Sequence, residues 1–203
     1  MFAQLFEIAG QKLLMTLLSE GLKPSSKVLD IGCGCLRGGY WLIHFLDKGC
    51  YFGIEPNVKM LEAGTRIILE PELAEIKMPQ FDHNEKFNFT VFREKFDFFI
   101  ARSIWTHASK QQIQIMLDRF ISNATSGGIF LTSYIRPSLF KKDYTGTGWV
   151  GKSHESNNPG IVRHSFGWIQ TECTTRGLVA KEIKEKAYNF GGQTWISIKH
   201  KAS

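Results

Sequence analysis

Two acidic residues follow neighbouring apolar segments, and together they could hold one ligand. Asp30 lies in the run Val28-Leu29-Asp30-Ile31-Gly32-Cys33-Gly34, and Glu55 ends the run Tyr51-Phe52-Gly53-Ile54-Glu55. In an open α/β sheet, ligands bind beyond the carboxyl ends of the strands, and an acid at the tip of the second strand suits ribose hydroxyls. Two carboxylates at one site favour a ligand that carries a ribose and a positive charge rather than a polyanion.

A dinucleotide site and a ligand-free packing turn are the alternatives for these glycines. The dinucleotide pattern Gly-x-Gly-x-x-Gly holds a pyrophosphate at a helix N-terminus. Here Arg37 stands at the third glycine position, and Asp30 lies beside the turn. A carboxylate there would repel a pyrophosphate and attract an ammonium or sulfonium group. The pattern therefore favours S-adenosylmethionine over a dinucleotide.

With these segments the chain resembles the class I S-adenosylmethionine-dependent methyltransferases. The first motif is 28–34, the second is Gly53-Ile54-Glu55-Pro56, and 96–103 is similar to the fourth strand and its end. One departure is that the usual Asp-x-Gly-x-Gly-x-Gly has a third glycine where this chain has Leu36, with glycines reappearing at 38–39. The resemblance covers nearly the whole chain and implies methyl transfer.

The resemblance also implies a set of cofactor-binding residues. Asp30 would organise the amino-acid end of the cofactor, with Arg37 near its carboxylate, and Glu55 would bind the ribose. Segments after the third and fourth strands would contact the adenine and methionine parts. The full predicted set is Asp30, Gly32, Cys33, Gly34, Arg37, Glu55, Pro56, Asn84, Phe87, Arg102 and Ser103.

The methyl acceptor is expected near a long connection over residues 136–164. Connections of this length are often functional, and this one follows the carboxyl end of the fifth strand. It is interpreted as a substrate lid, with an aromatic-anchored surface loop as the alternative. The predicted acceptor-binding residues are Trp105, His107, Tyr144, Trp149, His154 and His164.

His107 is the one candidate for acid–base chemistry. An alcohol acceptor needs a base with a pKa near neutrality, and His107 follows the fourth strand on the ligand side of the sheet. A histidine that only packs at a helix entrance is an equally weighted alternative. Trp105 is interpreted as a pocket wall or a core residue rather than a chemical participant.

Residues 146–153 match the phosphate-binding pattern Gly-x-x-x-x-Gly-Lys-Ser. That mechanism needs a buried strand before the loop and a helix after it. Lys141-Lys142-Asp143-Tyr144 precedes the loop and Pro159-Gly160 follows shortly after it. A chance match is therefore favoured, and a nucleotide hydrolase is kept as a less favoured alternative.

The elements that must position these residues follow from the apolar spacing. Alternating strands and helices predict a three-layer, Rossmann-like α/β sandwich in which a seven-stranded sheet is mostly parallel with an antiparallel C-terminal edge strand. The whole chain, 1–203, is interpreted as one domain that begins with a helix within 1–22. Strands are expected at 27–31, 50–55, 80–84, 96–101, 129–135, 178–185 and 193–199, with helices at 38–47, 57–69, 109–123 and 165–177.

Composition gives no indication of a membrane span or a zinc site. The chain has 203 residues, a net charge of +6 and no apolar stretch long enough to span a membrane. The four cysteines, Cys33, Cys35, Cys50 and Cys173, form no zinc pattern and are interpreted as thiols of a cytoplasmic protein. No metal is predicted.

The resulting hypothesis is a methyltransferase that acts on a small molecule. A methyltransferase for nucleic acid is less favoured, because the basic residues are dispersed and 102–107 carries neither an Asn/Asp-Pro-Pro-aromatic nor a Pro-Cys motif. A catalytically silent binding module of the same fold is the remaining alternative. The sequence leaves the oligomeric state open.

Overall fold

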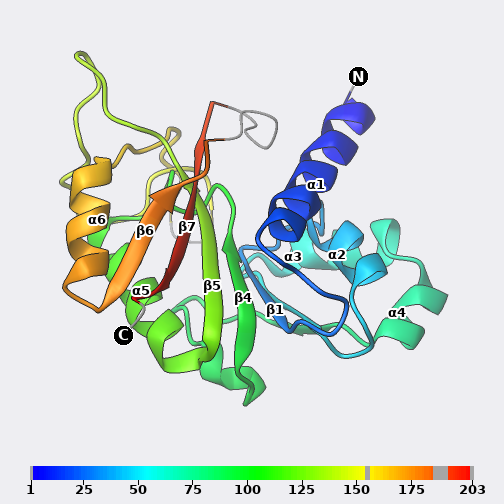
Figure 1. Cartoon of the computed structure of the whole chain (residues 1–203). Coiled ribbons are helices and arrows are strands. Elements are labelled where there is room, and N and C mark those ends of the chain that lie inside the picture. Colours follow the sequence, from blue (N-terminus) through cyan, green and yellow to red (C-terminus); the bar gives the residue numbers. More distant parts are fainter. Residues whose placement is uncertain (1, 154–155, 185–191, 202–203) are drawn as a thin grey trace.

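The computed structural model describes residues 2–153, 156–184 and 192–201. Its centre is a seven-stranded sheet with the order β3-β2-β1-β4-β5-β7-β6 (Figure 1). The strands are β1 Val28–Ile31, β2 Tyr51–Ile54, β3 Gln80–Asp82, β4 Phe96–Ala101, β5 Ala124–Tyr134, β6 Leu178–Glu182 and β7 Thr194–His200.

Helices cover both faces of this sheet. Figure 1 shows α1 to α4 on one side and α5 and α6 on the other. The helices are α1 Phe2–Ser19, α2 Gly39–Phe45, α3 Val58–Ala63, α4 Pro71–Lys77, α5 Lys110–Asn123 and α6 Phe166–Thr174. The three-layer α/β arrangement predicted from the sequence is therefore confirmed.

Alternation along the strands divides the core into two layers. Successive strand residues point to opposite faces: Phe98 and Ile100 pack in the layer with α1 and α2, whereas Phe99 and Ala101 pack in the layer with α5 and α6. Because β4 is buried on both faces, it reads as a continuous apolar run. This central strand and β1 beside it carry the predicted site residues at their ends.

The pairing pattern is parallel from β3 to β5 and antiparallel beyond it. β7 pairs antiparallel with both β5 and β6. The mostly parallel sheet with antiparallel pairing at its C-terminal side is thus confirmed. The last strand of the chain, β7, lies inside the sheet, and β6 forms the edge.

Three local features differ from the sequence-based expectations. β5 begins at Ala124 rather than at residue 129, because a register shift opposite Phe96 and Phe98 accommodates the residues around the glycine pair 127–128. The expected helix 57–69 is α3 followed by a π-helical turn, Gly64–Ile68. Helix α4 was not expected, although its proline at the first helical position is a common start signal.

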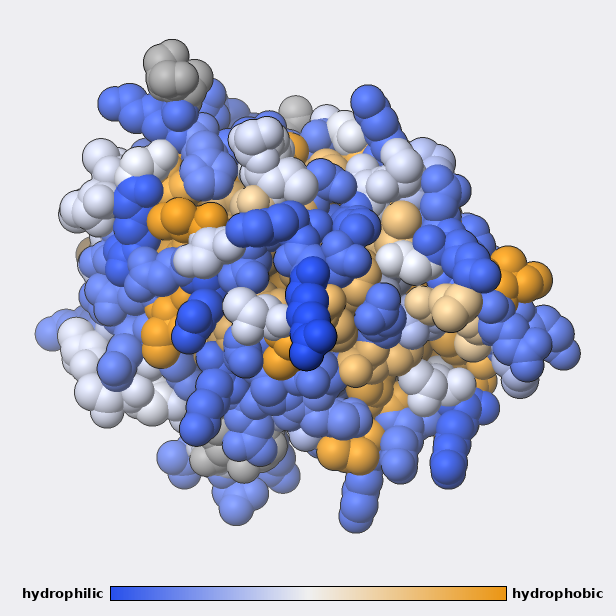
Figure 2. Space-filling model, turned by 90° about the horizontal axis from the view of Figure 1, so that it is seen from below, coloured by the Kyte–Doolittle hydropathy of each residue, from blue (hydrophilic) through white to orange (hydrophobic). Residues whose placement is uncertain are grey.

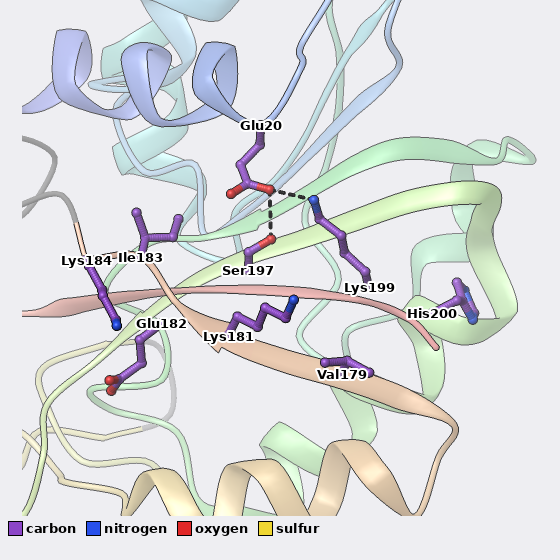
Figure 3. Close-up of a pocket in the computed structure, with 9 residues that line it drawn as sticks. All are labelled: Glu20, Val179, Lys181, Glu182, Ile183, Lys184, Ser197, Lys199 and His200. Carbon is purple, nitrogen blue, oxygen red and sulfur yellow. Dashed lines mark hydrogen bonds and ion pairs between the residues drawn. The ribbon is translucent and has the colours of Figure 1, made fainter. Parts of the chain in front are cut away.

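Helix α1 is fastened to the sheet through its C-terminal end. The Glu20 carboxylate accepts a hydrogen bond from Ser197 Oγ at 2.9 Å and pairs with Lys199 Nζ at 2.8 Å. Figure 3 shows these contacts in a pocket between the end of α1 and strands β6 and β7. None of the predicted site residues lines this pocket.

The face of the molecule seen from below the view of Figure 1 is mainly polar. Figure 2 shows hydrophilic side chains over most of the visible face, with scattered apolar patches between them. Among the described residues, no helix combines the length and apolarity needed to cross a membrane.

Candidate active site

Two adjoining hollows lie where β1, β2 and β4 end, and we treat them as one cleft. Both are lined by Gly32, Glu55 and Ile104. The first hollow, named here the β2–β3 hollow, is further lined by Ile31, Ile54, Pro56, Asn84, Glu85, Phe87, Trp149 and Ser153. The second, named the β1–β4 hollow, is further lined by Leu13, Asp30, Cys33, Gly34, Cys35, Arg37, Gly38, Met60, Arg102 and Ser103. The structure therefore brings all eleven predicted cofactor residues to one cleft.

Asp30 is a buried carboxylic acid beneath the β1–β4 hollow. The Tyr51 hydroxyl donates a hydrogen bond to Asp30 Oδ2 at 2.8 Å, and both side chains are buried. Burial raises the pKa of Asp30 to about 6, with the Tyr51 hydrogen bond opposing, Glu55 adding to the rise and Arg102 opposing it. A cation brought into the hollow would favour the ionised form of this group.

Glu55 connects the glycine turn to the start of α3. Its Oε2 accepts a hydrogen bond from the Gly34 N–H at 3.0 Å, and its Oε1 accepts one from the Asn57 N–H at 2.8 Å. Asn57 in turn caps α3 by accepting from the Met60 N–H. Carboxylate oxygens accept more than one hydrogen bond, so Glu55 retains capacity for a hydroxyl donor in either hollow.

Backbone conformation and close contacts determine which residues fit in and after the glycine turn. Gly32 has φ +72°, and a Cβ there would lie 2.2 Å from Ile104 Cδ1. Leu36, which replaces the usual third glycine, keeps a left-handed backbone with φ 62° while its side chain is fully buried. A Cβ on Gly39 would lie 2.4 Å from Tyr51 Oη. Gly39 thus leaves the room through which Tyr51 reaches Asp30.

Two arginines give the β1–β4 hollow a positive side opposite Asp30. Burial and the neighbouring Arg37 guanidinium lower the pKa of Arg102 to about 10, while Asp30 opposes this change. Arg102 also donates a hydrogen bond to the Ala9 carbonyl of α1 at 3.5 Å. One end of the cleft therefore presents a carboxyl group and guanidinium groups together, which suits the ammonium and carboxylate of an amino acid.

Ser103 ends β4 within a polar network that the sequence did not indicate. Its backbone has φ 59°, and its N–H donates to Ser133 Oγ at 2.9 Å. Gln193 completes the network, because its Oε1 accepts from Ser133 Oγ at 2.6 Å and its Nε2 donates to Ser103 Oγ at 2.8 Å. Ser133 and Gln193 come from β5 and the segment before β7, and only the sheet pairing brings them together.

The β2–β3 hollow is shaped by the loop after β3. Asn84 donates through its N–H and its Nδ2 to Asp82 Oδ1 and accepts through Oδ1 from the Asn88 N–H. These bonds fix the loop, so Asn84 has a structural role besides lining the hollow. Phe87, with φ 51°, contributes an aromatic wall. Glu85 and Ile104 line the cleft but were absent from the predicted set.

His107 and Trp149 are held together beside the cleft. Their rings are stacked with centroids 5.5 Å apart. His107 Nδ1 lies 2.7 Å from the Val150 carbonyl, and because a carbonyl only accepts, Nδ1 carries the proton and Nε2 keeps a lone pair. Trp149 lines the β2–β3 hollow, whereas His107 lies behind it and lines neither hollow.

Of the other predicted acceptor residues, Trp105, Tyr144 and His164 line neither hollow. Trp105 is fully buried in the core against Phe130, and His164 is fully buried with Nε2 donating to the Ala108 carbonyl. Burial also lowers the pKa of His164. Tyr144 donates its hydroxyl to the Gly148 carbonyl within the loop. His154 lies outside the described residues. Apolar packing, which the sequence pattern did not reveal, explains why Trp105 and His164 do not line the cleft.

The phosphate-binding pattern at 146–153 lacks its structural context. Within the described part of the chain around it, residues 141–146 form no strand, and the next helix after it is α6. In the same described residues, no cluster of three or more His, Cys, Asp or Glu side chains could hold a metal ion.

The sheet order and the cleft at the ends of β1, β2 and β4 define a Rossmann-like α/β protein. The family described as "Methyltransferase domain" matches residues 22–190. The chain therefore belongs to this methyltransferase family. Among curated proteins, none matches the chain in sequence.

Solved structures of methyltransferases share this fold. Magnesium protoporphyrin IX methyltransferase from Synechocystis PCC 6803, solved with bound SAM, is 15% identical with a TM-score of 0.66, covering 94% of this chain and 79% of that one. The glycopeptide N-methyltransferase MtfA, complexed with SAM, is 11% identical with a TM-score of 0.67 and coverage of 95% and 93%. A sugar N-methyltransferase from a Streptoalloteichus species is 11% identical, with a TM-score of 0.67 and coverage of 97% and 88%.

Proposed function

We propose that this protein is an S-adenosylmethionine-dependent methyltransferase with a small-molecule acceptor. The observation that carries the proposal is the placement of Asp30 and Glu55 on either side of the glycine turn, in a cleft that also holds Arg37 and Arg102. When bound, S-adenosylmethionine supplies a methyl group on a sulfonium centre. Family membership supports this chemistry.

Each end of the cleft fits one part of this cofactor. Asp30 would bind the ammonium group, and Arg37 and Arg102 would bind the carboxylate of the amino-acid part. The Glu55 carboxylate would accept hydrogen bonds from ribose hydroxyls. Pro56, Asn84 and Phe87 would surround the adenine in the β2–β3 hollow. Gly32 and Ser103 would border the reacting region, with Gly34 and Cys33 forming the floor of the turn.

The acceptor is proposed to enter from the side of the loop 136–164. In methyl transfer, alignment of the acceptor atom with the methyl group supplies much of the acceleration. His107 Nε2, with its lone pair available, would accept a proton from an acceptor hydroxyl that reaches it beside the stacked Trp149. A small acceptor is favoured because the similar structures include enzymes named for porphyrin, glycopeptide and sugar methylation. A cytoplasmic location stays a prediction from the cysteine pattern.

Calorimetry tests the cofactor assignment directly. Wild-type protein should bind S-adenosylmethionine and S-adenosylhomocysteine but neither NAD nor ATP. Glu55→Ala should weaken binding of both nucleosides about tenfold to a hundredfold, because it removes a charged hydrogen-bond acceptor. The matched control is Glu62→Ala, which removes an exposed acid from the same region of the chain and should leave both affinities unchanged.

Three results would contradict the proposal. Unchanged S-adenosylhomocysteine affinity in Glu55→Ala would remove the ribose assignment. ATP binding that is lost in Lys152→Ala and retained in Glu55→Ala would support a nucleotide hydrolase instead. Tight cofactor binding without methylation of any member of a broad acceptor panel would identify a silent binding module.

A further inference from the structure

Trp149 belongs to the long loop after β5, yet its indole ring lines the β2–β3 hollow. The same hollow is lined by Glu55 and Pro56 from the end of β2, by Phe87 from the loop after β3 and by Ile104 from the end of β4. A loop that was expected to hold the acceptor therefore supplies a wall of the nucleoside end of the cleft. Phe87 and Trp149 are the aromatic side chains among its lining residues.

The backbone around Trp149 is fastened rather than loosely placed over the cleft. The Val150 N–H donates to the His107 carbonyl at 2.9 Å, and His107 Nδ1 donates to the Val150 carbonyl at 2.7 Å. Gly151 continues this segment with φ +121°, and a Cβ there would lie 2.4 Å from His107 Nδ1. The rings of His107 and Trp149 stack beside these bonds, with their centroids 5.5 Å apart.

The indole nitrogen of Trp149 has an unmet hydrogen bond. Trp149 Nε1 is closed off from solvent and has no hydrogen-bond partner among the described residues. Leaving a buried donor unpaired is unfavourable, since the group has lost its bond to water without gaining another. A ligand that enters the hollow and shifts the ring can supply the missing acceptor. A purine nucleoside offers several such atoms in its base and ribose.

We propose that Trp149 is a cofactor-contacting residue that covers the adenosyl part of the ligand and donates its indole N–H to it. This inference rests on the proposed function, because it assigns a second wall to the same cofactor site. The segment 149–151 then belongs to the cofactor pocket, and the acceptor would contact other residues of the loop. Cofactor binding would thereby arrange one side of the acceptor site.

The test compares Trp149→Phe with Tyr144→Phe in the intact protein, using S-adenosylhomocysteine as the probe. Phenylalanine keeps an aromatic ring at 149 and removes the N–H. Titration calorimetry should show about three- to tenfold weaker binding for Trp149→Phe, the usual effect of one lost hydrogen bond. Tyr144→Phe removes a hydroxyl of the same loop that bonds to the Gly148 carbonyl, and the affinity of this variant should match the wild type.

Tryptophan fluorescence gives a second measurement. If Trp149 only packed within the fold, ligand binding would not change its emission. S-adenosylhomocysteine should alter the indole emission of the wild type and of Tyr144→Phe, and Trp149→Phe should lose most of that change. Thermal unfolding of each variant checks that the fold is retained.

Three outcomes separate this inference from the proposed function. If the wild type and Trp149→Phe bind S-adenosylhomocysteine equally, the inference is overturned while the proposed function stands. Equal weakening in Trp149→Phe and Tyr144→Phe also overturns it, because the effect then belongs to the loop in general. If the wild type does not bind S-adenosylhomocysteine at all, the proposed function itself fails.

Discussion

At the scale of single residues, the most consequential group is the carboxyl of Asp30. It is buried, it accepts a hydrogen bond from Tyr51, and its pKa is raised from 3.8 to about 6, chiefly by burial. A raised pKa means that the ionised carboxylate is less favourable in the folded protein than in the unfolded chain. Near neutral pH the ligand-free protein therefore holds an ionised group that a cationic ligand would stabilise.

This arrangement predicts opposite effects of Asp30→Asn on stability and on binding. The pKa of Asp30 is higher in the folded protein than in the unfolded chain, so its protonated form favours folding. This contribution to the free energy of unfolding is fully present below pH 3.8 and is lost as the pH rises through about 6. Asparagine does not titrate, so the ligand-free variant should be more stable than the wild type at pH 7, by up to about 3 kcal/mol. Its affinity for S-adenosylhomocysteine should fall at least about tenfold, since a charged hydrogen bond is lost.

Thermal unfolding from pH 4 to pH 8, with calorimetry at pH 7, measures both effects. The stability difference between Asp30→Asn and the wild type should shrink towards pH 4, where Asp30 is protonated in the folded state. A difference that does not depend on pH would contradict the raised pKa. Glu62→Gln, at an exposed site on α3, serves as the control for a simple change of net charge.

The residue types of the cleft were largely predictable, but the network behind them was not. Asp30 and Glu55 follow from their positions after apolar runs. Tyr51 was read only as part of a strand, because its bond to Asp30 depends on the space left by Gly39. Trp105 and His164 were expected at the acceptor site, but they lie in the interior, and nothing in their local sequence distinguishes a buried ring from an exposed one.

At the scale of elements, the loop 136–164 is attached to the segment between β4 and α5 at several points. Besides the Val150 contacts, the Val162 N–H donates to the Thr106 carbonyl at 2.7 Å. The His164 N–H donates to the Ile135 carbonyl at 3.1 Å, which joins the two ends of the loop. Backbone hydrogen bonds of this kind place the loop across the ligand side of the sheet. The segment after β4 therefore positions both Ser103, a proposed cofactor-binding residue, and the loop.

Gly151→Ala tests how firmly this attachment holds. With φ +121° and a Cβ position 2.4 Å from His107 Nδ1, alanine would be strained and would push against the histidine ring. We expect a loss of about 1–3 kcal/mol in the free energy of unfolding, or local opening of the segment instead. Denaturant unfolding and amide hydrogen exchange at Val150 report these two results.

Gly148→Ala is the matched control, because a Cβ on Gly148 has open space and its φ is ordinary. It should leave both measurements unchanged. Equal behaviour of the two variants would show that the contact with His107 does not constrain the loop.

Elements with strong local signals were predicted closely. Helix α5 begins after Ser109, whose side chain forms a capping box with Gln112, and this start was read from the sequence. The π-helical turn at Gly64–Ile68 had no such signal. It arises where Gly64 approaches the backbone of Cys35, and a Cβ there would lie 2.7 Å from the Cys35 carbonyl carbon. Contacts between distant segments set such details, so a local pattern does not contain them.

At the scale of the whole molecule, the cleft joins the ends of β1, β2 and β4, which form the middle of the sheet. A ligand bound there contacts segments from both halves of the chain. Binding to the folded state alone stabilises the entire protein by mass action. Because the strand order brings these segments together, ligand binding at this one site should raise the stability of the whole protein.

Ligand-induced stabilisation is therefore expected as a rise in melting temperature. At about a hundred times the dissociation constant, S-adenosylhomocysteine should add about 2.7 kcal/mol, which corresponds to about 5–11 °C for a protein of this size. Differential scanning fluorimetry measures the shift. ATP at the same concentration should produce none, and Glu55→Ala should show a smaller shift at the wild-type ligand concentration. A shift with ATP but none with S-adenosylhomocysteine would contradict the proposed cofactor.

The insertion of β7 between β5 and β6 has a consequence for biosynthesis. Among the described strands β6 pairs with β7 alone. It therefore cannot join the sheet until the segment Thr194–His200 has left the ribosome. During synthesis β6 remains unpaired until β7 is available. A premature stop codon before Thr194 would leave β5 and β6 without the strand that pairs with both.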